Sequence, residues 1–290
     1  MAIDRVAVLG GGLMGSGIAE SVAGAGLSVV VRDVDATAVD AARGRVEGSL
    51  GRARERGKID DAAHAEILGR IAFTDRLEDL ADADLVVEAV PENAELKAAI
   101  LGEVAGIVSE DALIASNTSS IPIAQLASGL ARPDRVLGLH FFSPVPVMRL
   151  VEIVVALDTS EEIVATAQDF AERVGKRAII TKDRSGFVVN MLLVPYLMAA
   201  VRMYEEGFAS AEDIDEGMKL GCGHPMGPLT LADFIGLDVL YAIGDSLYEE
   251  FKQTEYAPPP LIKRMVASGR IGRKAGRGFY EYRKDHAAIS

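Results

Sequence analysis

A glycine-rich segment near the N-terminus constrains the fold more than any other feature of the chain. Residues 10–15 read Gly-Gly-Gly-Leu-Met-Gly, and they lie between a short apolar run at 6–9 and a helical pattern at 14–25. Glycine in this spacing permits a tight turn, close approach of a pyrophosphate to the backbone, and close packing of the helix on the strand. The N-terminus of the helix adds unpaired N–H groups and a positive dipole. We predict a dinucleotide site at Gly10, Gly12, Leu13, Met14 and Gly15.

An acidic residue selects the dinucleotide. Asp33 follows a second apolar run, and a carboxylate there can accept hydrogen bonds from the adenosine ribose 2′-hydroxyl. The same charge repels the 2′-phosphate of NADP, so we predict NAD as the cofactor. The neighbouring Arg32 can partly accommodate a phosphate, although adjacent strand residues point to opposite faces.

Short apolar runs alternate with helical patterns through the first part of the chain. This order is typical of βαβ units, and it predicts an α/β domain with a Rossmann-type, doubly wound sheet. The predicted strands are residues 6–9, 29–31, 85–87, 113–115, 136–139, 150–155 and 178–181, and the predicted helices are 14–25, 36–56, 94–108 and 123–127, with a further helix opened by a capping box at 159–162 and ending near 174.

Two further regions depart from this alternation. Residues 41–70 are charged and longer than an ordinary crossover, which indicates a projecting helical insertion. After a hinge-like Asp-Arg-Ser-Gly at 183–186, only helical patterns follow, at 187–207, 211–220, 230–251 and 260–267. We therefore predict an NAD-binding domain at 1–183 and an all-α domain for substrate binding and dimerisation at 184–290.

The overall charge excludes some partners. The net charge of −13 argues against nucleic acid as a partner, and it requires a local basic cluster for any polyanionic ligand. The longest apolar stretch, 186–203, contains Asn190, Pro195 and Arg202, so we predict no membrane span. The single cysteine, Cys222, excludes an intrachain disulfide and fits a reducing compartment, and no signal peptide is visible. We expect a cytoplasmic protein, and no pattern predicts a metal site.

One histidine lies where such a sheet binds ligands. Of the four histidines, His140 directly follows an apolar strand, at the carboxyl end where open α/β sheets hold their ligands. Oxidation of an alcohol needs a base for the hydroxyl proton, and Glu152 on the next strand can hold the imidazole in one tautomer. The alternative is a packed loop histidine without a chemical role.

Several motifs together resemble the 3-hydroxyacyl-CoA dehydrogenase family, most closely the short bacterial 3-hydroxybutyryl-CoA dehydrogenases. They run through the chain in order: Ser-Asn-Thr-Ser-Ser at 116–120, Gly-Leu-His-Phe-Phe-Ser-Pro-Val-Pro-Val-Met at 138–148, Leu-Val-Glu at 150–152, Gly-Phe-Val-Val-Asn at 186–190, His-Pro-Met-Gly-Pro at 224–228 and Gly-Arg-Lys-Ala-Gly-Arg-Gly-Phe-Tyr at 272–280. The resemblance covers almost the whole chain.

The resemblance implies roles for particular residues. His140 is the expected general base, oriented by Glu152, while Ser119 binds the substrate 3-oxygen beside the nicotinamide and Asn190 positions the substrate carbonyl. The expected cofactor contacts also include Glu92, Lys97, Ser119, Ser143 and Lys274. Each has a plain structural alternative: Ser119 and Asn190 can cap helices, and the charged residues can be solvated. Ser143 stands where the family commonly has Asn, and Met191 where it commonly has Arg.

A basic run within the insertion can meet the phosphates of CoA. Residues 52–58 supply four basic side chains, and Arg and Lys bind phosphate by charge-assisted hydrogen bonds. The family implies CoA contacts at Ser49 and Arg56, with Lys58 as a neighbouring candidate, and Ser119 and Asn190 complete the substrate contacts. An ordinary solvated helix face is the alternative.

We therefore expect NAD-dependent, reversible oxidation of a short-chain (S)-3-hydroxyacyl-CoA, such as 3-hydroxybutyryl-CoA, by a homodimer. One alternative is a dehydrogenase of free hydroxy acids, related to gulonate dehydrogenase or lens crystallin. The other is a cofactor-binding protein without catalytic activity.

Overall fold

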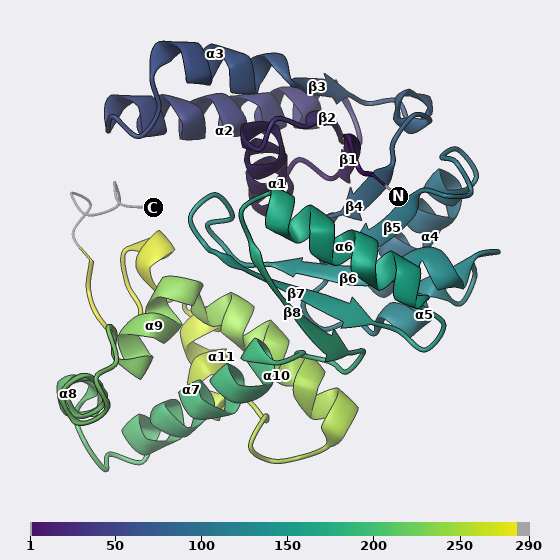
Figure 1. The fold of residues 1–290 in the computed structure, drawn as a ribbon. Coiled ribbons are helices and arrows are strands. Elements are labelled where there is room, and N and C mark those ends of the chain that lie inside the picture. The colour runs from purple at the N-terminus through teal and green to yellow at the C-terminus, as the bar shows by residue number, and fades with distance from the viewer. Residues whose placement is uncertain (1, 283–290) are drawn as a thin grey trace. The chain divides into compact units, whose positions relative to one another are not determined.

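The computed structural model describes residues 2–282. The chain divides into two compact units, Met1–Arg184 and Ser185–Ser290, and each is described here by itself (Figure 1).

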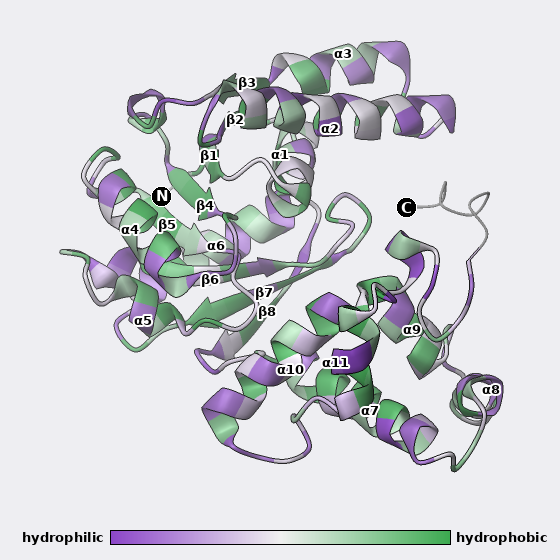
Figure 2. Ribbon diagram, turned by 180° about the vertical axis from the view of Figure 1, so that it is seen from behind, coloured by the Kyte–Doolittle hydropathy of each residue, from purple (hydrophilic) through white to green (hydrophobic). Residues whose placement is uncertain are grey.

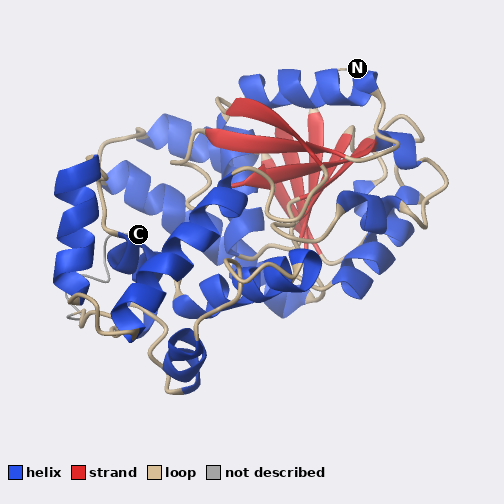
Figure 3. Ribbon diagram, turned by 90° about the horizontal axis from the view of Figure 1, so that it is seen from below, coloured by secondary structure: helices blue, strands red, loops and turns tan. Residues whose placement is uncertain are grey.

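The first unit is built on one eight-stranded sheet in the order β3-β2-β1-β4-β5-β6-β7-β8. The strands from β3 to β6 run parallel, β7 pairs antiparallel with β6, and β8 pairs parallel with β7. Figure 3 shows the strands as one twisted layer with helices on both sides. The strands are β1 (Arg5–Leu9), β2 (Ser28–Arg32), β3 (Ile71–Thr74), β4 (Leu85–Glu88), β5 (Leu113–Ser116), β6 (Val136–Phe141), β7 (Leu150–Val155) and β8 (Arg177–Lys182).

Helices cover both faces of the sheet, and successive side chains of a strand point to opposite faces, so both faces of the central strands are buried. Val8 lies in a core cluster with Ile18 of one helix and Phe170 of another, whereas Leu9 lies in a second cluster with Ile100. This two-sided burial explains why β1 is a continuous apolar run rather than an alternating one. The helices of this unit are α1 (Leu13–Gly24), α2 (Ala36–Glu55), α3 (Asp61–Gly69), α4 (Ala94–Ala105), α5 (Ile123–Ala127) and α6 (Glu161–Arg173).

The charged insertion forms the antiparallel-looking pair α2 and α3, which lie side by side in Figure 1. Helix α2 buries only four residues, Val39, Ala42, Val46 and Leu50, and α3 buries none. Hydrophilic residues are accordingly frequent on both helices in Figure 2. The sequence analysis did not predict β3, an edge strand of four residues that directly follows the charged insertion and buries only Ile71.

The second unit is helical, with α7 (Val189–Glu205), α8 (Ala211–Cys222), α9 (Pro228–Ile235), α10 (Leu237–Phe251) and α11 (Pro260–Ala267). The prediction of one helix over 230–251 is wrong. Gly236 has a φ of 102°, which no α-helical residue adopts, and it separates α9 from α10. The α/β class with a helical insertion and an all-α C-terminal part is confirmed. Within residues 2–282, no helix is both long and apolar enough to cross a membrane.

Candidate active site

The glycine loop is shaped by contacts that leave no room for side chains except at one position. A Cβ at Gly10, where φ is 91°, would lie 2.8 Å from the carbonyl oxygen of Ala89, and one at Gly15 would lie 1.8 Å from the carbonyl oxygen of Gly10. A Cβ at Gly12 would meet nothing within 4 Å. Gly12 is also the N-cap of α1, where the first N–H groups have no partner within the helix. The open side of the loop thus coincides with the donors that a pyrophosphate needs.

Asp33 holds the loop and the end of β2 together. Its Oδ2 accepts a hydrogen bond from the N–H of Gly11 at 2.8 Å, and its Oδ1 accepts one from the N–H of Val34 at 2.8 Å. Arg32 is directed toward the neighbouring strand, where its Nε donates to the carbonyl oxygen of Asp75 at 3.3 Å. The carboxylate at the end of β2 is therefore fixed in place beside the loop.

His140 and Glu152 form a hydrogen-bonded pair inside the first unit. Nδ1 of His140 lies 2.7 Å from Oε2 of Glu152, and the two residues are 6% and 0% exposed. They are directly paired across β6 and β7, so their side chains share one face of the sheet. The ring of Phe142 lies 4.6 Å from the imidazole, between ring centres. A histidine with a buried carboxylate on Nδ1 is equipped for acid–base chemistry at Nε2.

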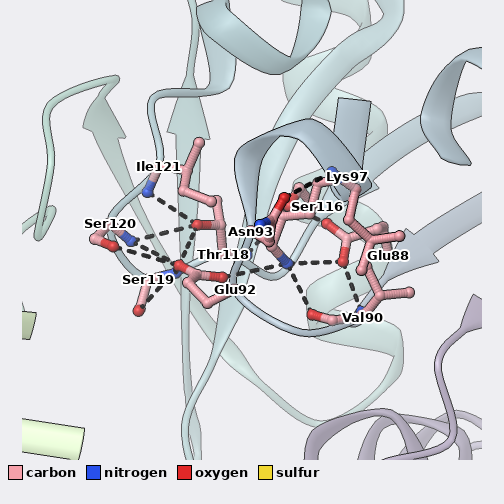
Figure 4. A network of polar contacts seen from close by, with 11 residues as sticks. Glu88, Val90, Glu92, Asn93, Lys97, Ser116, Thr118, Ser119, Ser120 and Ile121 are labelled. Atoms are coloured by element: carbon pink, nitrogen blue, oxygen red, sulfur yellow. Dashed lines mark hydrogen bonds and ion pairs between the residues drawn. The ribbon is translucent and has the colours of Figure 1, made fainter. Parts of the chain in front are cut away.

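Glu92 gathers the loop that follows β5 (Figure 4). Its Oε1 accepts hydrogen bonds from the hydroxyl of Thr118 at 2.6 Å and from the N–H of Ser119 at 3.0 Å. The hydroxyl of Ser119 contacts the same oxygen at 3.3 Å. Burial raises the pKa of Glu92, but the charge of Lys97 and these hydrogen bonds outweigh it and hold the pKa below its usual value. Glu92 therefore stays ionised and fixes this loop, residues 117–121, which we call the serine loop.

The buried ion pair of Lys97 and Glu88 lies beside Glu92, and Lys97 also contacts Glu92 itself (Figure 4). Nζ of Lys97, which is 1% exposed, lies 2.7 Å from Glu88 Oε1 and 3.2 Å from Glu92 Oε2. The other oxygen of Glu88 accepts a hydrogen bond from the hydroxyl of Ser116 at 2.5 Å. The family motifs predicted Lys97, whereas no motif predicted a role for Glu88 or Ser116. Both are the last residues of their strands, β4 and β5, and that position at the carboxyl edge of the sheet is the signal that could have identified them.

Asn117 links the loop after β5 to β6, the strand that carries His140. Its Oδ1 accepts a hydrogen bond from the N–H of Phe141, the residue after His140, at 2.9 Å. Asn117 belongs to the motif at 116–120, but no sequence pattern predicts its contact with Phe141, which lies 24 positions away.

Ser119 does not cap helix α5, which was the structural alternative to a role in the site. Helix α5 has Pro122 as its N-cap, without a side-chain cap. Its first N–H groups, on Ile123 and Ala124, donate instead to the carboxylate of Asp183 at 2.8 and 2.7 Å. Ser119 is half-buried in the loop before α5, and its hydroxyl contacts Glu92 rather than the N-terminus of that helix.

The second unit holds three of the singled-out residues. Asn190 is buried in the first turn of α7, whose N-cap is Val188 and carries no side-chain cap, so capping does not explain Asn190 either. Lys274 binds Asp238 through Nζ at 2.7 Å. Met191, at one of the two departures from the family pattern, packs against the helical core and accepts a contact from the hydroxyl of Tyr256 at 3.7 Å.

The predicted CoA residues lie at the far half of α2 and just beyond it. Ser49 is half-buried, whereas Arg56, the C-cap of α2, and Lys58 are exposed. Ser143 is exposed in the loop after β6. A cavity of about 470 Å³ lies against the inner face of α2 at Leu50.

The remaining titratable candidates lie elsewhere. His64 lies on α3, and His224 contacts the hydroxyl of Tyr196 through Nδ1 at 3.2 Å in the second unit. His286 lies outside the described residues, and Cys222 is exposed at the end of α8. Among residues 2–282, no group of three or more His, Cys, Asp and Glu side chains is placed to hold a metal ion.

Comparison with known proteins places the chain. Residues 5–184 match the NAD-binding domain of 3-hydroxyacyl-CoA dehydrogenase, and residues 186–282 match the C-terminal domain of the same family. The chain is 51% identical over 283 residues to a 3-hydroxybutyryl-CoA dehydrogenase of Mycobacterium tuberculosis, covering 97% of this chain and 99% of that protein.

Solved structures agree. The crystal structure of FadB2 from M. tuberculosis is similar with a TM-score of 0.96 and 50% identity, covering 98% of this chain and 100% of the other. That of (S)-3-hydroxybutyryl-CoA dehydrogenase PaaH1 from Ralstonia eutropha has a TM-score of 0.92 and 47% identity, covering 98% and 100%. The predicted resemblance and the predicted NAD cofactor are confirmed, and the chain belongs to the 3-hydroxyacyl-CoA dehydrogenase family.

Proposed function

We propose that the protein catalyses the reversible, NAD-dependent oxidation of a short-chain (S)-3-hydroxyacyl-CoA, such as 3-hydroxybutyryl-CoA, to the 3-oxoacyl-CoA. The observation that carries this proposal is the buried pair of His140 and Glu152, 2.7 Å apart. A structural protein has no need of a buried carboxylate paired with a histidine at the carboxyl end of a sheet. The substrate class rests on the names of relatives that match nearly the full chain.

His140 acts as the base in oxidation and as the acid in reduction. With its hydrogen on Nδ1 directed at Glu152, the neutral imidazole has its lone pair on Nε2, which accepts the proton of the substrate 3-hydroxyl. The Glu152 carboxylate then stabilises the imidazolium that forms, because it is buried and hydrogen-bonded to the same ring. NAD, when bound, supplies the hydride acceptor.

Ser119 donates a hydrogen bond to the substrate 3-oxygen. Glu92 accepts the backbone N–H of Ser119, and Lys97 fixes Glu92, so the serine lies on a loop of defined geometry. The Ser119 hydroxyl has one hydrogen, which turns from Glu92 at 3.3 Å to the substrate oxygen when the substrate binds. A donor that is preorganised in this way stabilises the negative charge that develops on the oxygen. We propose that Glu92 and Lys97 serve the nicotinamide half of the cofactor chiefly through this loop. Asn190 of the helical unit positions the substrate carbonyl.

The cofactor is held by the glycine loop and Asp33, with Ser143 and Lys274 as further contacts. The open side of Gly12 and the unpaired N–H groups of α1 fit the pyrophosphate. Asp33, fixed by the N–H groups of Gly11 and Val34, presents its charge to the ribose hydroxyls. Its ion pair with Asp238 holds Lys274 near the start of α10.

The acyl-CoA phosphates bind along α2, at Ser49, Arg56 and Lys58. Residues 49, 52 and 56 share one face of a helix, because they are three and four positions apart. Burial raises the pKa of Glu20 in α1, and the hydroxyl of Ser49 and the charge of Arg52 oppose that rise, so both side chains lie near Glu20, which itself lines the cavity beside α2. A polar and basic face beside a cavity suits a phosphorylated thioester carrier.

The helical unit also carries apolar residues that a homodimer would cover. Leu192, Phe208 and Leu220 are each more than 70% exposed. Exposed apolar side chains of this size mark association surfaces when they gather in one region. We propose that the protein is a cytoplasmic homodimer, which sedimentation equilibrium of the purified protein tests directly.

Steady-state kinetics test the function. The expected result is oxidation of NADH with acetoacetyl-CoA at a rate well above that with free 3-oxo acids, a higher rate of NAD reduction with 3-hydroxybutyryl-CoA than with free 3-hydroxy acids, and loss of nearly all activity in His140→Ala. Turnover of free acids alone would support the alternative hydroxy-acid dehydrogenase. Unchanged turnover in His140→Ala would contradict the mechanism.

A further inference from the structure

Helix α2 packs directly on the glycine loop. A Cβ at Gly11 would lie only 2.2 Å from the Cβ of Ala42, the middle of the buried face of α2. Gly11 is therefore a glycine because a helix, and not a ligand, approaches it. Side chains of α2 therefore lie within reach of the loop backbone.

Arg45, one turn beyond Ala42, reaches the loop. Its Nη1 donates a hydrogen bond to the carbonyl oxygen of Gly11 at 3.0 Å. The hydroxyl of Ser16, a buried residue of α1, donates to the same oxygen at 2.8 Å. The N–H of Gly11 donates to Asp33. Side chains from three elements thus bind both polar groups of this one residue.

The two donors set the direction of the next N–H group. In a trans peptide the C=O of Gly11 and the N–H of Gly12 point in opposite directions. A peptide between two glycines rotates readily, because neither residue carries a Cβ that restricts its dihedral angles. Drawing the Gly11 carbonyl toward Arg45 and Ser16 turns the Gly12 N–H to the opposite side, and at Gly12 a Cβ would meet nothing within 4 Å.

We propose that Arg45 is a positioning residue for the cofactor: with Ser16 it fixes the Gly11–Gly12 peptide so that the Gly12 N–H is presented to the NAD pyrophosphate. The guanidinium also leaves a positive charge beside a loop that binds an anion, in a protein of net charge −13. The inference rests on NAD binding alone and is independent of the proposed acyl-CoA substrate and the catalytic residues.

Arg43 provides a matched control on the same helix. It is exposed like Arg45, it lies two residues away, and its guanidinium stacks 4.6 Å from the ring centre of Phe73, away from Gly11. Arg43→Met and Arg45→Met change the net charge by the same amount. Any difference between these variants therefore reports the contact with the loop.

The test measures the Kd of NADH for the full-length protein by fluorescence titration, without any acyl-CoA. Arg45→Met is expected to raise the Kd about five- to tenfold, as loss of a charge-assisted hydrogen bond does. Arg43→Met is expected to stay within about twofold. The gap is expected to persist at 0.5 M NaCl, where long-range attraction is screened. In turnover, the loss is expected in KM for NADH rather than in kcat.

Ser16→Ala supplies an independent variant. It removes the second donor to the same carbonyl, so it is expected to raise the Kd of NADH, and its effect is expected to be non-additive with that of Arg45→Met. Equal losses in Arg43→Met and Arg45→Met, a gap that vanishes at high salt, or additive effects of Ser16→Ala and Arg45→Met would each overturn the proposal. Inactivity toward acyl-CoA with normal NADH titrations would instead overturn the proposed function and leave this inference standing.

Discussion

His140 and Glu152 stand directly opposite one another on the antiparallel strands β6 and β7, with Nδ1 of the histidine 2.7 Å from Oε2 of the glutamate. Directly paired residues point to the same face of a sheet, and a register shift of one residue would place them on opposite faces. The sheet register itself therefore aligns the acid–base pair, without help from any flexible loop.

Replacing the carboxylate tests the pair. Glu152→Gln keeps the shape but removes the charge that stabilises the imidazolium and selects its tautomer. We expect kcat to fall about 10²- to 10⁴-fold, the usual contribution of acid–base catalysis. The measurement is acetoacetyl-CoA reduction at saturating NADH. Glu161→Gln, an exposed residue at the start of α6, is the control and should retain activity. A loss in KM alone, with kcat intact, would contradict the role given to Glu152.

Because Glu92 holds the serine loop in place, we expect the activity to depend on it. Glu92→Gln removes the charge paired with Lys97 and one acceptor for the residues at 118–120, so we expect kcat/KM for acetoacetyl-CoA to fall about tenfold. Glu95→Gln, an exposed acid in the first turn of α4, is the matched control. Equal effects of the two variants would show that only general charge is involved.

The same residue predicts a pH dependence of stability. The pKa of Glu92 is lowered in the folded protein, so its contribution to the free energy of unfolding is complete above the unfolded value of about 4.3 and is lost as the pH falls through the lowered pKa. Urea unfolding of wild type and Glu92→Gln should differ most near pH 7 and converge in this acid range. A difference that grew toward low pH would reverse the sign and refute the assignment.

We predict that the choice between NADH and NADPH depends on Asp33. Asp33→Asn removes the charge that repels a 2′-phosphate and weakens the bond to the Gly11 N–H. We expect kcat/KM with NADH to fall about tenfold while that with NADPH holds or rises, narrowing the preference for NADH by at least that factor. Asp35→Asn is the control, since Asp35 only caps α2 through Ala38. An unchanged ratio in Asp33→Asn would place the selectivity elsewhere.

Alanine substitutions at two glycines of the helical unit, Gly278 and Gly217, are expected to change stability in opposite directions. A Cβ at Gly278 would lie 1.9 Å from Oδ1 of Asp233, a fully buried carboxylate that also binds the N–H groups of Phe279 and Tyr280. Gly278→Ala should therefore destabilise the unit by about 1–3 kcal/mol or more. Gly217→Ala, in α8 with nothing within 4 Å of the new Cβ, should stabilise it by about 0.5–1 kcal/mol. Chemical denaturation distinguishes the two, and similar shifts would contradict the packing at Asp233.

Sequence patterns predicted most of the elements because two-sided burial makes each central strand a short apolar run. Sequence patterns failed where an element is only partly buried or where a feature depends on backbone conformation. The short edge strand β3 is not buried on both faces and directly follows the charged insertion, and the helix break at Gly236 depends on a backbone angle that a single glycine does not reveal. The antiparallel direction of β7 left no mark either, since a strand reads the same in both directions.

The candidate residues divide in the same way. Asp33 and the glycines were predictable because their spacing carries the chemistry. His140, Glu152, Ser119 and Asn190 were selected mainly through family motifs, and their roles stay predictions that the kinetic tests address.

The sequence by itself determined the α/β class, NAD as the cofactor and, through its motifs, membership in the family, and it predicted the glycine loop as the cofactor site. Those features depend on residue type at short spacing along the chain. The sequence already paired Glu152 with His140, but only the tertiary structure gave that contact its register and distance and brought Lys97 to Glu88 and Arg45 to Gly11. Such contacts follow from strand register and helix packing, which bring together residues that are 9, 12 and 34 positions apart and that no local pattern connects.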